Sequence, residues 1–172
     1  MAARKATPLA GWRRQAVRRM EASRAEMLRL VARLPEAEVL RPRTQDAWSI
    51  KDVLAHLLAG DEETLRRFHL IALGQADRIQ WFDLDYAHLF NARAVALGRR
   101  LDLKAILGRM KRARARLIAG FRRLPDAALR DPGHDYTVVS WLPAPGWSHE
   151  REHAREIRDW WRAQRGARTR RR

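Results

Sequence analysis

Apolar residues recur along this chain at the spacing of one helix face, in long segments separated by prolines and glycines. Five segments show the pattern: residues 8–34, 49–73, 84–97, 103–124 and 148–165. Repeats at i, i+3, i+4 and i+7 place apolar side chains on one side of a helix and leave the other side polar. The pattern therefore predicts an all-α fold in which long amphipathic helices each bury one face.

Local signals support these helix boundaries. Ser49, Asp102 and Ser148 are residues that commonly cap a helix N-terminus, and Asp52 follows Ser49 at the spacing of a capping box. Prolines and glycines follow the predicted helix ends. Tyr136–Trp141 is the one β-like run, and it lies in a long loop, so we expect no sheet.

A short motif occurs twice in the chain, each time between two predicted helices. The two copies are Leu34-Pro35-Glu36-Ala37 followed by Trp48-Ser49, and Leu124-Pro125-Asp126-Ala127 followed by Trp147-Ser148. A pseudo-twofold axis relating two helical hairpins would place both Trp-Ser helix starts at the same end of the bundle. His56 would then lie near His149 and His153.

Length and composition indicate a single domain. The chain has 172 residues, of which 46% are hydrophobic, enough to bury a substantial core. We expect this domain to span residues 8–165, between a disordered N-terminus at 1–7 and a basic disordered tail at 166–172. Cysteine is absent, which excludes thiolate ligands and suits a reducing compartment. Without a signal peptide or a membrane-spanning run, we expect a cytoplasmic protein.

The formal net charge is +16 at pH 7. Such a charge favours weak binding to nucleic acids at low salt. Arginine supplies 32 of the 36 basic residues, however, which also fits a bias of genomic base composition. The basic residues are spread over the polar faces of several helices, and the predicted outer face of the 103–124 helix carries Arg109, Lys111, Arg112, Arg114 and Arg116.

Three histidines are candidate metal ligands. His149 and His153 are spaced i, i+4 and project from one side of the last helix, while His56 lies at the shoulder of the apolar stripe of the second. Three neutral imidazoles suffice to hold a catalytic divalent ion such as zinc or nickel. The alternatives remain open: a polar helix N-terminus for the pair, and a groove histidine bonded to a carbonyl for His56.

Other residues surround this candidate site in the predicted arrangement. Asp52, Glu150 and Glu152 are close enough in sequence to orient the imidazoles. Trp48 and Trp147 precede the helices that carry the ligands, and they either wall a pocket or pack in the core. The sequence assigns no catalytic residue.

The stretch from Trp48 to Leu57, the His149-x-x-x-His153 helix and the Leu-Pro-acid helix ends resemble the DinB-like superfamily over residues 8–165. The segment Leu89-Phe90-Asn91-Ala92 and the Trp-rich last helix are similar to its ClbS/DfsB-like branch, which adds Asn91 to the candidate site. The resemblance implies an up-down-down-up four-helix bundle, with an extra short helix before the third and often a homodimer. It also implies a metal triad at His56, His149 and His153.

The resemblance further implies a class of activity. Members include metal-dependent thiol transferases and isomerases, and the ClbS/DfsB-like branch contains hydrolases that protect DNA from an electrophilic genotoxin. We therefore expect a metal-dependent hydrolase or thiol-dependent transferase that acts on a small-molecule substrate. The alternatives are a nucleic-acid-associated protection protein, suggested by the charge, and a non-catalytic stress-related bundle with a vestigial site.

Overall fold

The protein is described from a computed structural model, which covers residues 9–43, 48–131 and 136–169. The described residues form helices and turns, with no strand among them, so the all-α prediction is confirmed. No helix in these ranges is long and apolar enough to cross a bilayer. The predicted disordered N-terminus at 1–7 lies outside the described residues.

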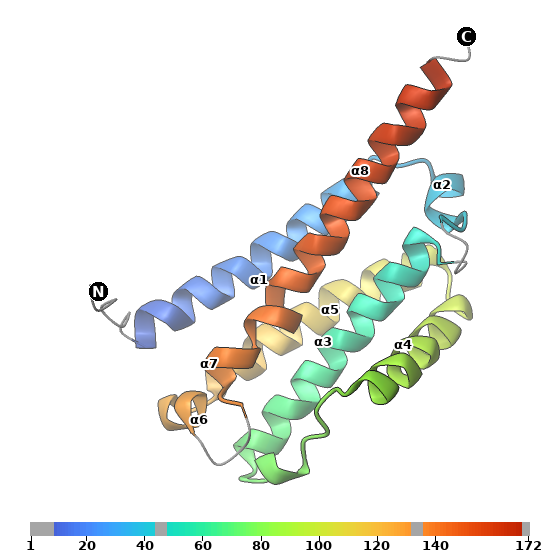
Figure 1. Cartoon of the computed structure of the whole chain (residues 1–172). Coiled ribbons are helices and arrows are strands. Elements are labelled where there is room, and N and C mark those ends of the chain that lie inside the picture. The colour runs from blue at the N-terminus through green and yellow to red at the C-terminus, as the bar shows by residue number, and fades with distance from the viewer. Residues whose placement is uncertain (1–8, 44–47, 132–135, 170–172) are drawn as a thin grey trace, which may run out of the picture.

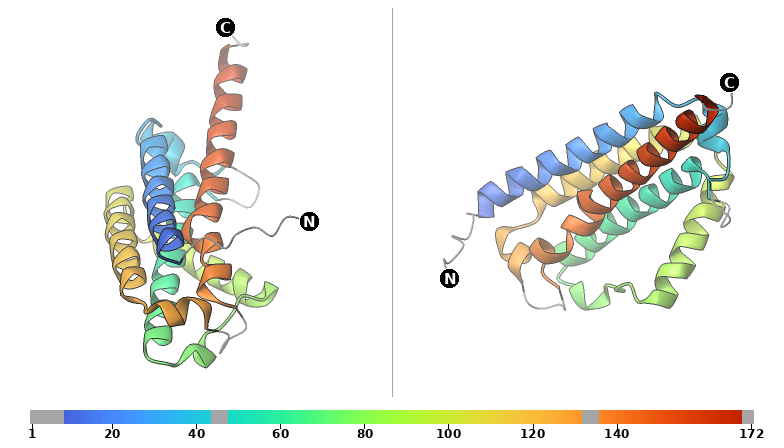
Figure 2. Two further views of the ribbon diagram at one scale, coloured as in Figure 1. Left: turned by 90° about the vertical axis from the view of Figure 1, so that its left-hand side faces the viewer. Right: turned by 45° about the horizontal axis from the view of Figure 1, so that its top comes forward.

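Four long helices form the bundle: α1 (Leu9–Val31), α3 (Ile50–Ala72), α5 (Leu103–Arg123) and α8 (His149–Thr169). Figure 1 shows α1 and α8 running in one direction and α3 and α5 in the other, which is the expected up-down-down-up order. α8 projects past the ends of its neighbours toward the C-terminus (Figure 2). It continues through Gly166 to Thr169, beyond the predicted helix end at residue 165.

The extra helix predicted before the third bundle helix is α4 (Leu84–Arg99), which connects α3 to α5 and lies against α3. The approach is close at Gly98, where an added Cβ would overlap the methyl group of Ala55. Asp83 caps the start of α4 by accepting a hydrogen bond from the backbone N–H of Tyr86, 2.7 Å away. The sharp turn after α3 uses Gly74, whose φ is +68°.

The repeated Leu-Pro-acid-Ala motif folds in the same way in both copies. Pro35 and Pro125 each stand at the N-cap of a five-residue helix, α2 (Glu36–Leu40) and α6 (Asp126–Arg130) respectively. Each short helix buries one apolar residue, Val39 in the first and Leu129 in the second. The repeat therefore marks two equivalent corners of the bundle.

The stretch before α8 differs from the prediction. Val138–Trp141, predicted to be β-like, forms the short helix α7, because Thr137 caps it and the described part of the chain contains no strand for it to pair with. A π-helical turn, η2 (Ala144–Ser148), then runs directly into α8. The predicted N-cap at Ser148 is wrong, because this residue lies inside a continuous helical run.

A buried layer of charge divides the core in two. The apolar cluster on one side includes Met20 and Phe68, and the cluster on the other includes Met27 and Leu54. Between them each bundle helix contributes one charged side chain: Arg24, Asp61, Arg114 and Glu150, all at most 4% exposed. We call these four residues the polar layer. Arg114 was predicted to lie on the outer face of its helix, and that prediction is wrong.

Candidate metal centre

His56 lies near the N-terminus of α3, in its second turn. The capping box predicted there is present: the Ser49 side chain accepts from the Asp52 N–H at 3.1 Å, and the Ser49 N–H donates to the Asp52 carboxylate at 2.9 Å. These bonds fix the first turn of α3 and therefore the direction in which His56 projects.

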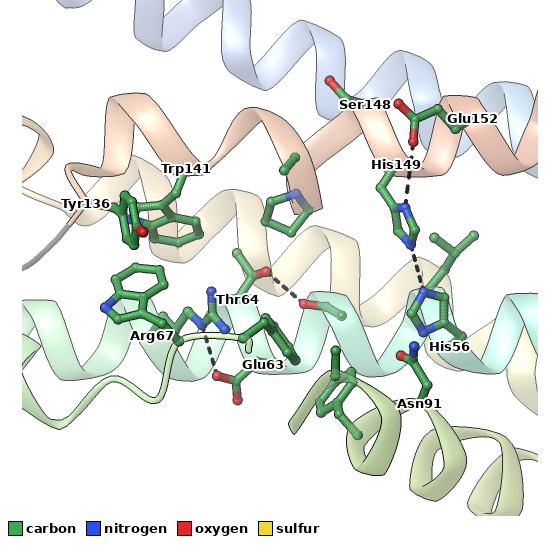
Figure 3. A pocket seen from close by; sticks show the side chains of 18 of the residues that line it. His56, Glu63, Thr64, Arg67, Asn91, Tyr136, Trp141, Ser148, His149 and Glu152 are labelled. Atoms are coloured by element: carbon green, nitrogen blue, oxygen red, sulfur yellow. Dashed lines mark hydrogen bonds and ion pairs between the residues drawn. The ribbon is translucent and has the colours of Figure 1, made fainter. Parts of the chain in front are cut away.

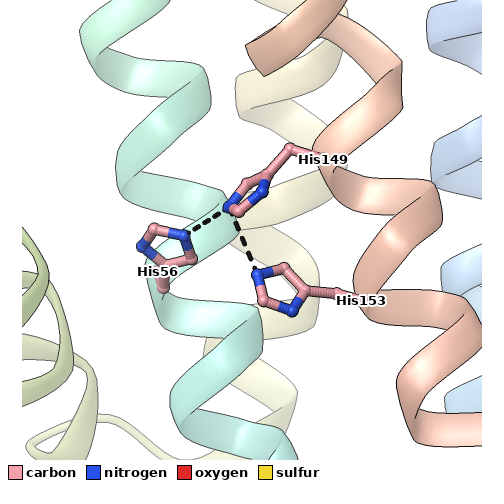
Figure 4. A group of neighbouring side chains, drawn as sticks. All are labelled: His56, His149 and His153. Atoms are coloured by element: carbon pink, nitrogen blue, oxygen red, sulfur yellow. Dashed lines mark hydrogen bonds between the residues drawn. The ribbon is translucent and has the colours of Figure 1, made fainter. Parts of the chain in front are cut away.

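His149 and His153 project from one side of α8 toward α3 (Figure 4). The prediction that both ligand-bearing helices start at the same end of the bundle is wrong, because α3 and α8 are antiparallel (Figure 1). The histidines meet nevertheless, because α7 and η2 precede α8 and move its first residue toward the middle of the bundle.

The three imidazoles converge through their Nε2 atoms. The Nε2 atom of His149 lies 2.7 Å from that of His56 and 3.2 Å from that of His153. One ligand atom from each ring lies within 4.8 Å of the others. The structure thus brings together the three residues that the sequence nominated.

The arrangement fits a divalent metal better than it fits hydrogen bonds between the rings. An imidazole Nε2 atom offers one in-plane site, which holds either a proton or a lone pair. The His149 Nε2 atom therefore cannot make good hydrogen bonds to both of its neighbours at once. Three lone pairs directed at one cation remove this conflict, and histidine nitrogens are ordinary ligands of zinc and nickel.

Burial favours the neutral form of His56 and His149. Desolvation, followed by the neighbouring His149 and His153, lowers the pKa of His56 from 6.5 to about 4. Burial and the neighbouring His153 also lower the pKa of His149, against the opposing effect of nearby glutamates. Because metals bind only the unprotonated nitrogen, both rings are in the form that ligation requires at neutral pH.

The second ring nitrogens differ in their partners. The Nδ1 atom of His153 lies 2.9 Å from the Glu156 carboxylate, while that of His149 lies 3.9 Å from Glu152, beyond hydrogen-bond distance. The Nδ1 atom of His56 is buried without a well-formed hydrogen bond. Asn91 of α4 faces this ring on the side away from His149 (Figure 3), and its hydrogen-bonding interaction opposes the lowering of the His56 pKa.

Two carboxylates that were candidates for orienting the ligands have other partners. Asp52 bonds to Ser49 and lies 3.3 Å from Arg99. Glu150, beside His149 in sequence, points into the core and is fully buried in the polar layer. The carboxylate that does hold a ligand, Glu156, was missed, although its i, i+3 spacing from His153 was visible in the sequence.

The two candidate tryptophans, Trp48 and Trp147, lie in different surroundings. The Trp48 ring lies 5.6 Å from the His56 ring and borders the site. Trp147 is 4% exposed and belongs to an apolar core cluster, where the Arg19 guanidinium lies 5.5 Å from its ring. Trp48 therefore packs against the core beside His56 without lining the pocket, and Trp147 lies within the core.

A pocket of about 610 Å³ opens beside the imidazoles. His56, Asn91, His149 and Glu152 line it at one end (Figure 3). Its walls come from α3, α4, η2 and α8, and from the segments around Trp81 and Trp141. His56 and His149 are therefore accessible to a small molecule through a largely apolar pocket.

Comparison with known proteins gives one match. The family model described as DinB superfamily matches residues 19–157, a span that includes all three histidines. No curated protein and no solved structure matches the chain.

Proposed function

The chain belongs to the DinB superfamily, and from this premise we propose that it is a metal-dependent enzyme acting on a small molecule. The superfamily is typically metal-associated, and the reaction classes we propose are hydrolysis and thiol-dependent transfer. The observation that carries the proposal is the convergence of three Nε2 atoms, with His56 and His149 lining one end of a 610 Å³ pocket.

The proposed ligands are His56, His149 and His153, with zinc or nickel as the metal. When bound, the metal would supply Lewis acidity and lower the pKa of a water or thiol toward neutrality. Glu156 fixes the ring of His153 through its Nδ1 atom, and Asn91 stands where an acceptor for the His56 Nδ1 proton is needed.

Glu152 is suited to proton transfer. Its side chain is 61% exposed and borders the pocket beside His149. Because the 3.9 Å separation from His149 is too long for a hydrogen bond, the carboxylate is free to accept a proton from a nucleophile in the pocket. Glu63, the other carboxylate lining the pocket, is held by Arg66 and Arg67, and these bonds lower its pKa.

Elemental analysis and metal titration test the proposal. We expect the purified protein to bind about one divalent ion per chain with three protein ligands, and His153→Ala to weaken this binding strongly. His88→Ala is the matched control, because His88 is exposed on α4 and does not line the pocket. A protein that binds no zinc or nickel, with stability and activity indifferent to all three histidines, would overturn the proposal and favour the non-catalytic bundle.

Three finer assignments rest on the resemblance seen in the sequence and belong to the same proposal. Within the superfamily we place the chain nearest the ClbS/DfsB-like branch, on the segment 89–92. We also propose a homodimer and a cytoplasmic location. Sedimentation analysis tests the dimer, and cell fractionation tests the location.

The exposed basic residues favour a second candidate function, association with nucleic acid. α1 and α5 are neighbours in the bundle, and both carry exposed basic side chains, including Arg14, Arg18, Lys111, Arg112 and Arg116. Duplex DNA binding with a steep dependence on salt is the expected result. No measurable binding at about 50 mM salt would remove this candidate.

A further inference from the structure

We infer that the pocket takes an elongated, largely apolar substrate with an uncharged aromatic ring at the end remote from the histidines, and that Gly60 keeps the passage to that end open. The orientation of the substrate rests on the proposed function, because its reacting end is assigned to His56 and His149. The existence of the aromatic end of the pocket does not depend on a metal.

The pocket follows one side of α3. His56, Gly60, Thr64 and Arg67 all line it, at spacings of four, four and three residues, which keep them on one helix face. The 11-residue separation between His56 and Arg67 corresponds to about 16 Å along the helix axis. A ligand that fills this space is therefore long compared with its width.

The end remote from the histidines is aromatic. The Trp81 ring lies edge-on to Tyr136 at 5.1 Å and to Trp141 at 5.8 Å, and all three residues line the pocket. Figure 3 shows Tyr136 and Trp141 at the opposite end of the view from His149. Aromatic rings pair favourably in edge-on and offset arrangements, so a ring of the ligand is well suited to this end.

The one cation at this end of the described pocket, Arg67, is already engaged by protein groups. The Arg67 guanidinium lies 4.8 Å from the rings of both Trp81 and Phe82, and its Nε atom donates to Glu63 at 3.0 Å. Arg67 is 4% exposed, so it braces the aromatic side chains more than it attracts an anion. The ligand group that lies here is therefore assigned as uncharged.

Gly60 lies in the middle of this passage. Glycine in a helix interior is unfavourable relative to alanine, so its position in α3 calls for a reason. Close packing does not require glycine here, because a Cβ at Gly60 would meet no atom within 4 Å, whereas a Cβ at Gly98 would overlap Ala55. A larger side chain at residue 60 would enter the open pocket and separate its two ends.

The first experiment uses metal-free protein and the apolar fluorescent probe N-phenyl-1-naphthylamine. We expect the wild type to bind the probe and Gly60→Leu to weaken binding about 10- to 100-fold, equivalent to losing the burial of one large apolar group. Gly108→Leu is the matched control, because Gly108 lies inside helix α5 and does not line the pocket. Thermal unfolding of each variant confirms that the fold is retained.

The second experiment uses zinc-loaded protein and a series of hydroxamates, from acetohydroxamate to phenylalkyl hydroxamates of increasing length. Each added methylene is expected to tighten binding by about fourfold until the ring reaches the aromatic end. Gly60→Leu should abolish this gain without changing the affinity for acetohydroxamate.

The outcomes separate the two proposals. Probe binding that Gly60→Leu weakens, together with no binding of acetohydroxamate, would support the pocket and count against the metal site. Acetohydroxamate binding without any gain from longer tails would overturn the inference and leave the proposed function standing. Probe binding that Gly60→Leu leaves unchanged would also overturn it.

Discussion

The polar layer provides the sharpest test of how this bundle is held together. Asp61 lies at its centre, where its carboxylate accepts a hydrogen bond from Arg24 at 2.9 Å and one from Arg114 at 3.2 Å. A further Arg114 nitrogen lies 2.8 Å from the other carboxylate oxygen, at an angle too bent for a hydrogen bond. Glu150 completes the layer by accepting from Arg24 at 2.6 Å and from Arg114 at 3.1 Å.

The perturbation is Asp61→Asn, which keeps the shape of the side chain and removes its charge. The layer then holds two buried arginines against one carboxylate. Burial raises the pKa of Asp61, and Arg114 and Arg24 oppose the rise, so the wild-type carboxylate is stabilised by its partners. Leaving a buried charge uncompensated costs about 3–5 kcal/mol, a large part of the roughly 5–15 kcal/mol that stabilises a typical domain.

Urea unfolding measures this cost. With an m-value of about 2 kcal/mol/M, a loss of about 4 kcal/mol lowers the midpoint by roughly 2 M. Asp126→Asn is the matched control, because Asp126 also pairs with an arginine, Arg13 at 2.6 Å, but has a side chain that is 65% exposed. An exposed pair of this kind is worth at most about 1 kcal/mol.

Equal midpoints for the two variants would refute the argument, because they would mean that the layer is hydrated or already unpaired. The double variant Asp61→Asn/Arg114→Met adds a second check. Since it removes one charge of each sign, it should lose less stability than the sum of the single changes. A strictly additive loss would show that the two side chains are not coupled.

Four further predictions concern the site and the helices that carry it. Glu156→Gln should weaken zinc binding about 10- to 100-fold by releasing the ring of His153, and an unchanged dissociation constant would show that the contact has no role. Zinc at about 100 times its dissociation constant should raise the unfolding free energy by roughly 2.7 kcal/mol, and a chelator should reverse this gain. Metal-free protein should lose stability as the pH falls from 6.5 toward about 4, because the unfolded chain takes up a proton that folded His56 does not. If the unfolding midpoint of His56→Gln depended on pH in the same way as that of the wild type, this prediction would be contradicted. Gly98→Ala should lower the free energy of unfolding by about 1–3 kcal/mol by pushing α4 away from α3. Gly60→Ala should raise it by up to about 1 kcal/mol, and calorimetry shows whether the two variants change stability in opposite directions.

The long helices could be predicted from the sequence because the periodic spacing of apolar residues is a local property of each segment. The prediction for residues 49–73 matches α3, Ile50–Ala72, and the capping box at Ser49 is present as expected. Competing signals caused the errors near α8. Serine is a favoured N-cap residue, but Ser148 lies within the helical run of η2 and α8, so no helix N-terminus is present there for it to cap.

The polar layer could not be predicted in the same way. Charged residues are seldom buried, so Arg114 was assigned to the outer face, and Arg24 and Asp61 were not singled out. Each becomes tolerable in the core only because the other three helices present its partners at the same height along the bundle. No spacing within one helix reports that coincidence.

By itself, the sequence determined the all-α class, the faces that the long helices bury and the three histidines that could serve as ligands. Only the tertiary structure decided that their Nε2 atoms meet, that Glu156 and not Glu150 supports the site, and that an aromatic pocket extends from it. The physical reason is that periodicity fixes the direction of a side chain around its own helix. How far one helix is shifted along its neighbour depends on packing over the whole bundle, and that shift selects the partners.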